Sequence, residues 1–401
     1  MRPHVLTTRA RALLGSGGVL VVGGMLLGFA DLTRVGALLV ALPLLALLLV
    51  GARPVRLRVV RQVAPPAVRP GESVKITLRL RSDGGRTPLL LGEERVPAAL
   101  GPPPRVLLPP VSPHEEVRVA YRASALVRGC HRLGPLVVTA TDPFELVWRQ
   151  VATEGAAELL VLPRVEPLTG LPAAGGGIGA EGSVPHQVAV GGEDDVALRD
   201  YRHGDDLRRV HWLATARTGE LMVRTEDRPS HRRTLLLLDA RQESHTTDPD
   251  GTLEWACAAA GSVAAHLDAA RYAVHLLTPR TCTAGHTHAL PAATVQEELA
   301  RVAPTQGGLD PLVHTASALA GAGGLVVAVV APLAPEQARR VAALRQVGSA
   351  AVALVVATEA HQAQALATAT LLRSHGWSAA AAAPHLPVHL AWAAALSGAA
   401  A

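Results

Sequence analysis

Aromatic residues and lysine are scarce in this chain of 401 residues. Phe, Tyr and Trp make up 2% of the sequence although 49% of it is hydrophobic, so the apolar excess comes from Ala, Leu and Val. Lys75 is the one lysine among 38 basic residues. The net charge is only +5, and acidic residues are interleaved with the arginines. The sequence therefore lacks the continuous basic footprint of a nucleic-acid-binding protein.

Cysteine is also rare, and the nucleophile and phosphate-binding motifs of common enzymes are missing. Cys130, Cys257 and Cys282 are widely spaced and odd in number, which excludes a disulfide framework and favours a reducing compartment. Cys282, His286 and His288 provide three metal ligands without an evident fourth, so a solvated loop is favoured over a zinc site. No Gly-x-Ser-x-Gly elbow or GxxxxGK[ST] loop occurs.

Two uncharged apolar runs near the N-terminus predict a membrane anchor. Residues 13–30 and 35–52 are each just long enough to cross the hydrocarbon as a helix. A secretory signal peptide is the rival interpretation, because Arg9 and Arg11 precede the first run and small residues close it. The second run argues against a signal peptide. We therefore expect residues 1–52 to form a transmembrane hairpin whose partner is the lipid bilayer.

The charges around the two runs predict the orientation of this hairpin. The basic residues on the flanks are Arg2, Arg9, Arg11, Arg53, Arg56, Arg58 and Arg61. Because positive residues stay on the cytoplasmic side, we expect a cytoplasmic-membrane protein with two spans and both termini in the cytoplasm. Small residues four apart, Gly24 with Gly28 and Ala37 with Ala41, would allow close helix packing, and chance spacing explains them equally well.

Residues 53–168 carry the pattern of a β-sandwich. Apolar and polar residues alternate from Val74 to Leu80, and clusters of proline and glycine punctuate the region. An immunoglobulin-like domain follows from this pattern. Cys130 and His131 are adjacent and would point to opposite faces of a strand, so we interpret their segment as structural. Asp142-Pro143 predicts a turn that Phe144 anchors on the core.

Residues 169–190 are rich in glycine and alanine and predict a linker, and residues 191–401 predict an α/β domain. The apolar run 234–239 reads as a strand that ends in Asp239, followed by a helix over 253–270. Further strands are predicted at 272–277, 324–330 and 350–356, and further helices at 295–302, 311–320, 335–347 and 361–374. This alternation predicts a Rossmann-like parallel sheet covered on both faces, with ligands at the carboxyl ends of its strands.

A dense charged segment, residues 201–224, precedes this sheet and reads as a hairpin-like unit. Its candidate partner-binding residues are Tyr201, Gly204, Asp205, Asp206, Arg208, Arg209, Trp212, Arg217, Glu220 and Arg224. Adjacent acids among arginines favour ion pairs and turn caps over catalysis. We expect Trp212 to be buried and the arginines around it to be exposed.

The sequence from Arg199 to Asp206, then Arg209-Val210-His211-Trp212 and Ala216 to Leu221, resembles the signature of the domain of unknown function 58 family. The upstream elements Arg-Gly-x-x-x-Leu-Gly-Pro (128–135) and Asp-Pro-Phe (142–144) also fit that family, except that Glu145 stands where glycine is usual. The resemblance implies a membrane hairpin, a β domain and a von Willebrand factor A-like domain, often encoded beside a MoxR-type AAA+ ATPase. It implies no established enzymatic activity.

Such von Willebrand A-like domains bind a divalent ion through an Asp-x-Ser-x-Ser loop that follows a strand. Here the loop reads Asp239-Ala240-Arg241-Gln242-Glu243, and Ala331-Pro332 follows a later strand where another aspartate is expected. A single carboxylate lacks enough ligands. We therefore expect a degenerate metal site without metal or cofactor, in which Asp239 contacts an arginine of its own domain.

Our leading hypothesis is a non-catalytic interaction or assembly module in the membrane, an adaptor for a MoxR-like AAA+ ATPase in an envelope or chaperone-like system. Its arginine-rich segment suits a carboxylate-bearing surface. One alternative is a metal-dependent hydrolase that uses Asp205, Asp206 and Asp239. Another is a purely structural membrane scaffold.

Overall fold

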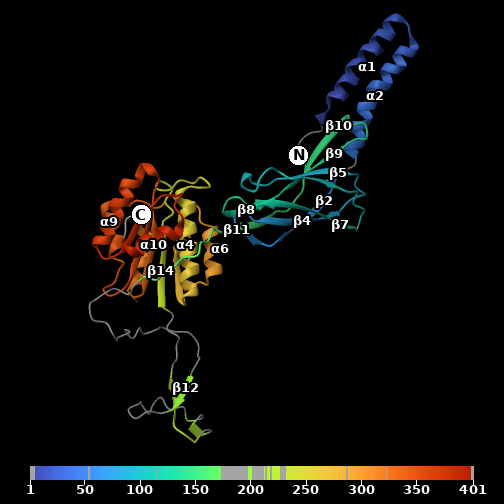
Figure 1. Ribbon diagram of the computed structural model, residues 1–401. Coiled ribbons are helices and arrows are strands. Elements are labelled where there is room, and N and C mark those ends of the chain that lie inside the picture. The colour runs from blue at the N-terminus through green and yellow to red at the C-terminus, as the bar shows by residue number, and fades with distance from the viewer. Residues whose placement is uncertain are drawn as a thin grey trace. The chain divides into compact units, whose positions relative to one another are not determined.

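The computed structural model describes residues 5–52, 55–113, 115–172, 197–200, 212, 215–216, 219–225, 232–285, 288–321 and 323–398. Internal contacts divide the chain into two units (Figure 1). The first unit comprises residues 1–164 and 296–302, and the second comprises residues 165–295 and 303–401.

The first unit begins with two apolar helices, α1 (Thr8–Leu27) and α2 (Ala30–Ala52). Both are long and apolar enough to cross a membrane, as the hydropathy pattern predicts. Gly28 ends α1 in the left-handed region, with φ 73°, and its N–H donates to the carbonyl of Gly24. Gly28 is therefore a helix cap and not the close-packing residue that its spacing from Gly24 suggests.

Other glycines bring the two helices together. A Cβ at Gly36 would lie 2.7 Å from the carbonyl oxygen of Gly17, and Gly24 approaches α2 equally closely. Ala37 and Ala41, which form the second predicted step, are exposed. The close packing compatible with the sequence is thus present, but it uses a seven-residue step from Gly17 to Gly24.

The remainder of the first unit is rich in β-sheet, as the alternation predicts. Three sheets have the strand orders β1-β10-β9-β5-β6, β2-β4-β7 and β3-β11-β8. The strands are β1 (Val5–Leu6), β2 (Leu57–Ala64), β3 (Ala67–Val68), β4 (Ser73–Ser82), β5 (Leu90–Glu94), β6 (Arg105–Leu108), β7 (Glu116–Ser124), β8 (Gly129–Leu133), β9 (Leu136–Thr141), β10 (Val147–Ala152) and β11 (Ala157–Val161). Val74, Ile76, Leu78 and Leu80 alternate into the core of this unit.

The turn between β9 and β10 contradicts one prediction. The side chain of Phe144 is 64% exposed and does not anchor the turn on the core. Instead the carboxylate of Asp142 holds the turn by accepting hydrogen bonds from the backbone N–H groups of Phe144, Leu146 and Val147. An aspartate that satisfies three backbone donors leaves the aromatic ring free to point outward.

The second unit contains a five-stranded sheet in the order β15-β14-β16-β17-β18, with every neighbouring pair parallel. Its strands are β14 (Arg232–Leu238), β15 (Tyr272–Leu277), β16 (Leu325–Val330), β17 (Ala351–Val356) and β18 (Ser378–Ala382). A separate antiparallel pair is formed by β12 (Ala197–Asp200) and β13 (Met222–Thr225). The sequence missed β18, because its run of alanine reads as helix.

Helices cover both faces of this sheet, as predicted. The helices of this part of the chain are α4 (Thr252–Ala269), α5 (Pro279–Thr283), α6 (Ala292–Ala300), α7 (Asp310–Ala320), α8 (Pro335–Ala342), α9 (Gln362–Ser374) and α10 (Val388–Ser397). Side chains of α7, α8 and α9 share one core with the sheet. Helices α4 and α10 pack on the strands as well. From Gln296 onward, α6 groups with the first unit.

Part of the predicted linker is fixed to the second unit. The carbonyl oxygen of Gly170 lies 2.8 Å from Nε2 of His266 and accepts a hydrogen bond from the indole N–H of Trp392. Just before the predicted linker, the backbone N–H of Glu166 donates to the hydroxyl of Ser262 at 2.9 Å. Residues 173–190, the rest of the predicted linker, lie outside the described residues.

Candidate functional site at the carboxyl edge of the parallel sheet

The strand order creates one position where a ligand site is expected. The chain leaves β14 toward β15 on one side, whereas β16 lies on the other side, so the strand order reverses between β14 and β16. Open parallel sheets bind ligands at such a switch point, beyond the carboxyl ends of the strands. Asp239 follows β14 there and Ala331 follows β16, and the two are joined by a hydrogen bond from Ala331 N–H to Asp239 Oδ2 at 3.3 Å.

A buried ion pair fills this position. Arg241 Nη2 lies 2.8 Å from Asp239 Oδ2, and Arg241 Nε lies 3.0 Å from Oδ1. The side chains are only 5% and 1% exposed. The backbone N–H of Arg241 also donates to Oδ1 at 3.1 Å. The predicted contact of Asp239 with an arginine of its own domain is confirmed, and it is a two-pronged one.

A buried histidine adjoins the pair. Nε2 of His245 lies 4.0 Å from Asp239 Oδ2 and has no hydrogen-bond partner among the described residues, while Nδ1 lies 3.2 Å from the hydroxyl of Thr252. Burial lowers the pKa of His245 below its usual value, an effect that the nearby carboxylate opposes only in part. The imidazole is therefore neutral at neutral pH, and the charge of Asp239 is balanced by Arg241.

This arrangement has direct chemical consequences. Both carboxylate oxygens of Asp239 already accept hydrogen bonds from the guanidinium and the backbone. Glu243, the last residue of the Asp-x-Ser-x-Ser position, is 78% exposed and lies 3.9 Å from Arg241. Within the described ranges, no group of three or more His, Cys, Asp or Glu side chains could hold a metal ion. The guanidinium thus occupies the place that a cation would need.

The charged segment is described only in part. Tyr201, Gly204, Asp205, Asp206, Arg208, Arg209 and Arg217 lie outside the described residues. Strands β12 and β13 pair at its two ends, with Arg224 opposite Leu198, and Glu220 is exposed.

The predicted burial of Trp212 is wrong, since its side chain is 67% exposed. Trp212 belongs to neither core that packs a sheet, so its ring lacks an apolar layer among the described residues.

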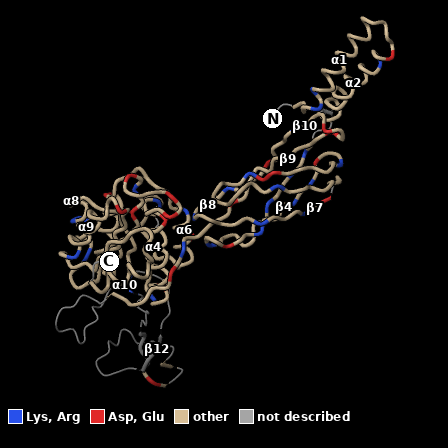
Figure 2. The backbone as a smooth tube through the Cα atoms, turned by 45° about the horizontal axis from the view of Figure 1, so that its top comes forward, with Lys and Arg blue, Asp and Glu red and all other residues tan. Residues whose placement is uncertain are grey.

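Sequence reasoning missed a basic surface on the first unit. Three cross-strand pairs on the outer face of the β2-β4-β7 sheet join like charges, namely Arg58 with Arg81, Arg79 with Arg118, and Lys75 with Arg122. Directly opposed like charges destabilise a sheet. Figure 2 shows Lys and Arg positions in the part of the backbone that includes β4 and β7. The alternation of Lys75, Arg79 and Arg81 was visible in the sequence, but the strand register that opposes them to other arginines was not.

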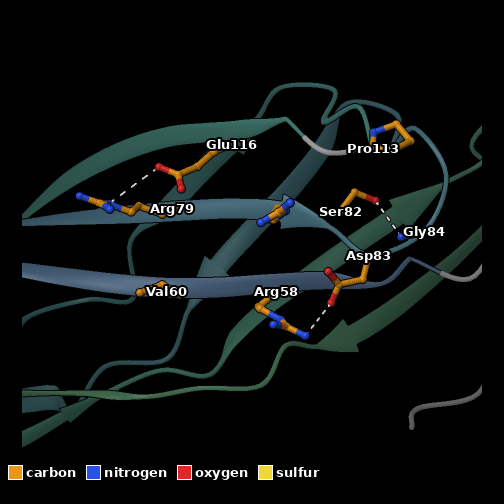
Figure 3. A pocket seen from close by; sticks show the side chains of 9 residues that line it. Arg58, Val60, Arg79, Ser82, Asp83, Gly84, Pro113 and Glu116 are labelled. Carbon is orange, nitrogen blue, oxygen red and sulfur yellow. Dashed lines mark hydrogen bonds and ion pairs between the residues drawn. The ribbon is translucent and has the colours of Figure 1, made fainter.

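A depression of about 660 Å³ lies on this basic surface (Figure 3). It is lined by Arg58, Val60, Arg79, Arg81, Ser82, Asp83, Gly84, Pro113 and Glu116. Two acids offset part of the charge, since Arg58 lies 3.3 Å from Asp83 and Arg79 lies 3.9 Å from Glu116. The remaining positive charge makes this surface a second candidate for binding an anionic partner.

The upstream signature elements have structural roles within the first unit. Arg128 is buried and donates to the carbonyls of Leu299 and Val302, at the end of α6. Gly134 has φ 98°, and a Cβ there would lie 2.8 Å from the guanidinium carbon of Arg61. That guanidinium forms a buried pair with Glu94, with Nε 2.6 Å from Oε1. The interpretation of this segment as structural is supported by these contacts.

Two apolar helices, a β-rich unit and a parallel α/β unit with a buried ion pair at its switch point define the class of this multidomain chain. Residues 197–339 match the family model described as protein of unknown function DUF58, which supports the DUF58 family. The match begins at β12 and ends in α8, so it covers the charged segment and the ion pair. A comparison with curated proteins finds no match.

Solved structures with local similarity are distant. The CARDB domain of the PF1109 protein from Pyrococcus furiosus is 16% identical over 25% of this chain and 93% of that chain, with a TM-score of 0.18. The complex of Zinc 2-glycoprotein and prolactin inducible protein from human seminal plasma is 10% identical over 27% of this chain and 96% of that chain, with a TM-score of 0.20. The β-glucosidase from Listeria innocua is 16% identical over 27% of this chain and 17% of that chain, with a TM-score of 0.15. Scores this low carry no argument about fold or function.

Proposed function

We propose that this chain is a membrane-anchored, non-catalytic interaction or assembly module. The observation that carries the proposal is the ion pair of Asp239 and Arg241 at the switch point of the parallel sheet. A guanidinium that binds both carboxylate oxygens competes with any cation for them. The carboxylate at the edge of the sheet where a related domain would bind a metal or carry out catalysis is therefore used in an internal ion pair.

The anchor, the β unit and the α/β unit each have a part in this proposal. The two apolar helices hold the chain in the cytoplasmic membrane with both termini in the cytoplasm, in accord with the arginines that flank them. The β unit is an immunoglobulin-like domain, and the α/β unit is a von Willebrand factor A-like domain with a degenerate metal site. The partner surface consists of the charged segment, residues 201–224.

The first partner to test is a MoxR-type AAA+ ATPase, which the family resemblance suggests by analogy. The guanidinium of arginine forms bidentate hydrogen bonds with carboxylates, so the charged segment suits an acidic surface on such a partner. The protein would then act as an adaptor in an envelope or chaperone-like system.

The experiment is a pull-down of the full-length chain in detergent against the neighbouring AAA+ ATPase, with and without ATP. The test variant is Arg208→Glu with Arg209→Glu. The matched control is Arg339→Glu with Arg340→Glu, two adjacent exposed arginines of α8 that undergo the same change of charge. We expect the test variant to lose binding and the control to keep it. Equal binding by both variants refutes the charged segment as the partner surface, and no capture of the ATPase by the unmodified chain refutes the adaptor role.

A further variant separates the two candidate surfaces. Arg81→Glu with Arg118→Glu reverses charge on the basic surface of the β unit and leaves the charged segment intact. If this variant alone loses the ATPase, the partner surface lies on the β unit. Thermal stabilisation by Mg²⁺ that disappears in Asp239→Asn would instead favour the metal-dependent hydrolase, and a chain that shows neither response behaves as a structural scaffold.

A further inference from the structure

The turn between β9 and β10 holds Phe144, which is exposed and lines a groove together with residues of both hairpin helices. Its three backbone hydrogen bonds to Asp142 have lengths of 2.9, 2.7 and 2.6 Å, from Phe144, Leu146 and Val147. Glu145 has φ 55°, a left-handed conformation in which glycine is usual. The backbone of the turn is therefore held in a defined conformation at Phe144.

The same turn is fastened to the start of α1. The backbone N–H of Thr7 donates to the carbonyl of Leu146 at 2.9 Å, and the Thr7 hydroxyl donates to the carbonyl of Glu145 at 2.8 Å. The guanidinium of Arg9 lies 2.8 Å from the Glu145 carboxylate. All of these residues belong to the first unit, so the ring and the hairpin keep a common position.

Apolar contacts extend this attachment along the helices. Leu146 and Val147 form a buried cluster with Ala10 of α1 and Ala46 of α2. Beside it lies an apolar groove of about 480 Å³, lined by Arg9, Ala12, Leu13, Ser16, Leu42, Phe144 and Leu146. The turn thus contacts the hairpin from the start of α1 up to the level of Leu13 on α1 and Leu42 on α2.

The length of the hairpin beyond this level decides where the turn lies in a membrane. At 1.5 Å per residue, α1 extends about 21 Å from Leu13 to Leu27, and α2 extends about 18 Å from Ala30 to Leu42. The hydrocarbon core of a bilayer is about 30 Å thick. If the turn remained in water, Asp31 and Arg34 at the tip would end inside the hydrocarbon, where charged side chains are costly.

We infer that Phe144 is inserted among the phospholipid acyl chains, and that the groove beside it holds one of these chains. The inference rests on the proposed membrane anchoring. Arg9 precedes Leu13 by about 6 Å along the helix axis. The exposed pair of Arg9 and Glu145 therefore lies at the level of the lipid headgroups while the ring lies below them. The Asp-Pro-Phe element sets the depth of the hairpin in the bilayer.

The test places the photoreactive amino acid p-benzoylphenylalanine at position 144 of the full-length chain. The protein is reconstituted into vesicles of phosphatidylcholine and phosphatidylglycerol and irradiated, and lipid adducts are quantified by mass spectrometry. Position 22, on an exposed part of α1, is the control for membrane insertion. Position 126 carries an equally exposed leucine after β7, at the end of the sheet remote from α2, and is the matched control on the β unit.

We expect lipid adducts at positions 144 and 22, and at least tenfold less at position 126. Adducts at position 22 without adducts at 144 overturn the inference and leave the membrane anchoring intact. An absence of adducts at both positions overturns the anchoring as well. Equal adducts at 144 and 126 overturn the inference too, because the whole β surface would then touch lipid without a specific role for Phe144.

Discussion

Replacing Arg241 by methionine removes the guanidinium from the pair with Asp239 and keeps an apolar chain of similar length. Asp239 would be left as a buried carboxylate whose remaining hydrogen bonds come from the backbone N–H groups of Arg241 and Ala331. Removal of one partner from a buried pair costs about 3–5 kcal/mol, since the other charge stays buried without compensation. We therefore expect a large loss of stability in the second unit.

The size of the effect makes it measurable by thermal unfolding. In a domain of this size, each kcal/mol shifts Tm by about 2–4 °C, so we expect Tm to fall by on the order of 10 °C. The intrinsic fluorescence of Trp255, Trp377 and Trp392 reports the transition, because all three indoles are buried in the second unit.

Two controls make the reasoning refutable. Arg340→Met removes an exposed arginine that lies 2.7 Å from Asp310, and such surface pairs contribute only about 0–1 kcal/mol. The double variant Asp239→Asn with Arg241→Met removes both charges, so its destabilisation should be at least ~1 kcal/mol smaller than the sum of the two single variants. Equal Tm shifts for Arg241→Met and Arg340→Met, or simple additivity in the double variant, would refute a buried charge pair.

Two further predictions concern pH and helix packing. Burial lowers the pKa of His245 in the folded chain, so the unfolded chain binds the proton more readily. The contribution of neutral His245 to the free energy of unfolding is therefore complete above about pH 6.5, the usual pKa of histidine. Below that pH the free energy of unfolding falls by at most ~1.4 kcal/mol per pH unit. His245→Gln should flatten Tm between pH 7 and pH 5, and an unchanged slope would contradict this. Gly36→Val would place a Cβ 2.7 Å from the carbonyl oxygen of Gly17 and separate the two helices, whereas Gly18→Val points into open space. Protease digestion in detergent should cut the hairpin faster in the first variant only.

Some features of the site followed from composition and order along the chain. An apolar strand that ends in Asp239, followed by Arg241 in place of a small hydroxyl residue, was enough to predict that Asp239 contacts an arginine of its own domain, without naming which one. The local chemistry decides this outcome, because residues two apart at the end of a strand meet in almost any packing of the sheet. The apolar runs of the hairpin are predictable for a similar reason, since a helix satisfies its own backbone and needs only length and hydropathy.

Features that depend on distant parts of the chain were not predictable. Phe144 and Trp212 were expected to be buried because their rings are large and apolar, yet exposure depends on whether another layer covers them. The alanine strand β18 lacks β-branched side chains and exists because β17 offers it a free edge.

By itself, then, the sequence determined most of the elements and their order, the apolar hairpin and the contact of Asp239 with an arginine of its own domain. Only the tertiary structure decided which strands are neighbours, and with that the switch point at Asp239, the opposed arginines of the basic surface and the level at which Phe144 meets the hairpin. The physical reason is that hydropathy and turn chemistry act over a few residues, whereas register, burial and charge opposition arise between segments that are remote along the chain.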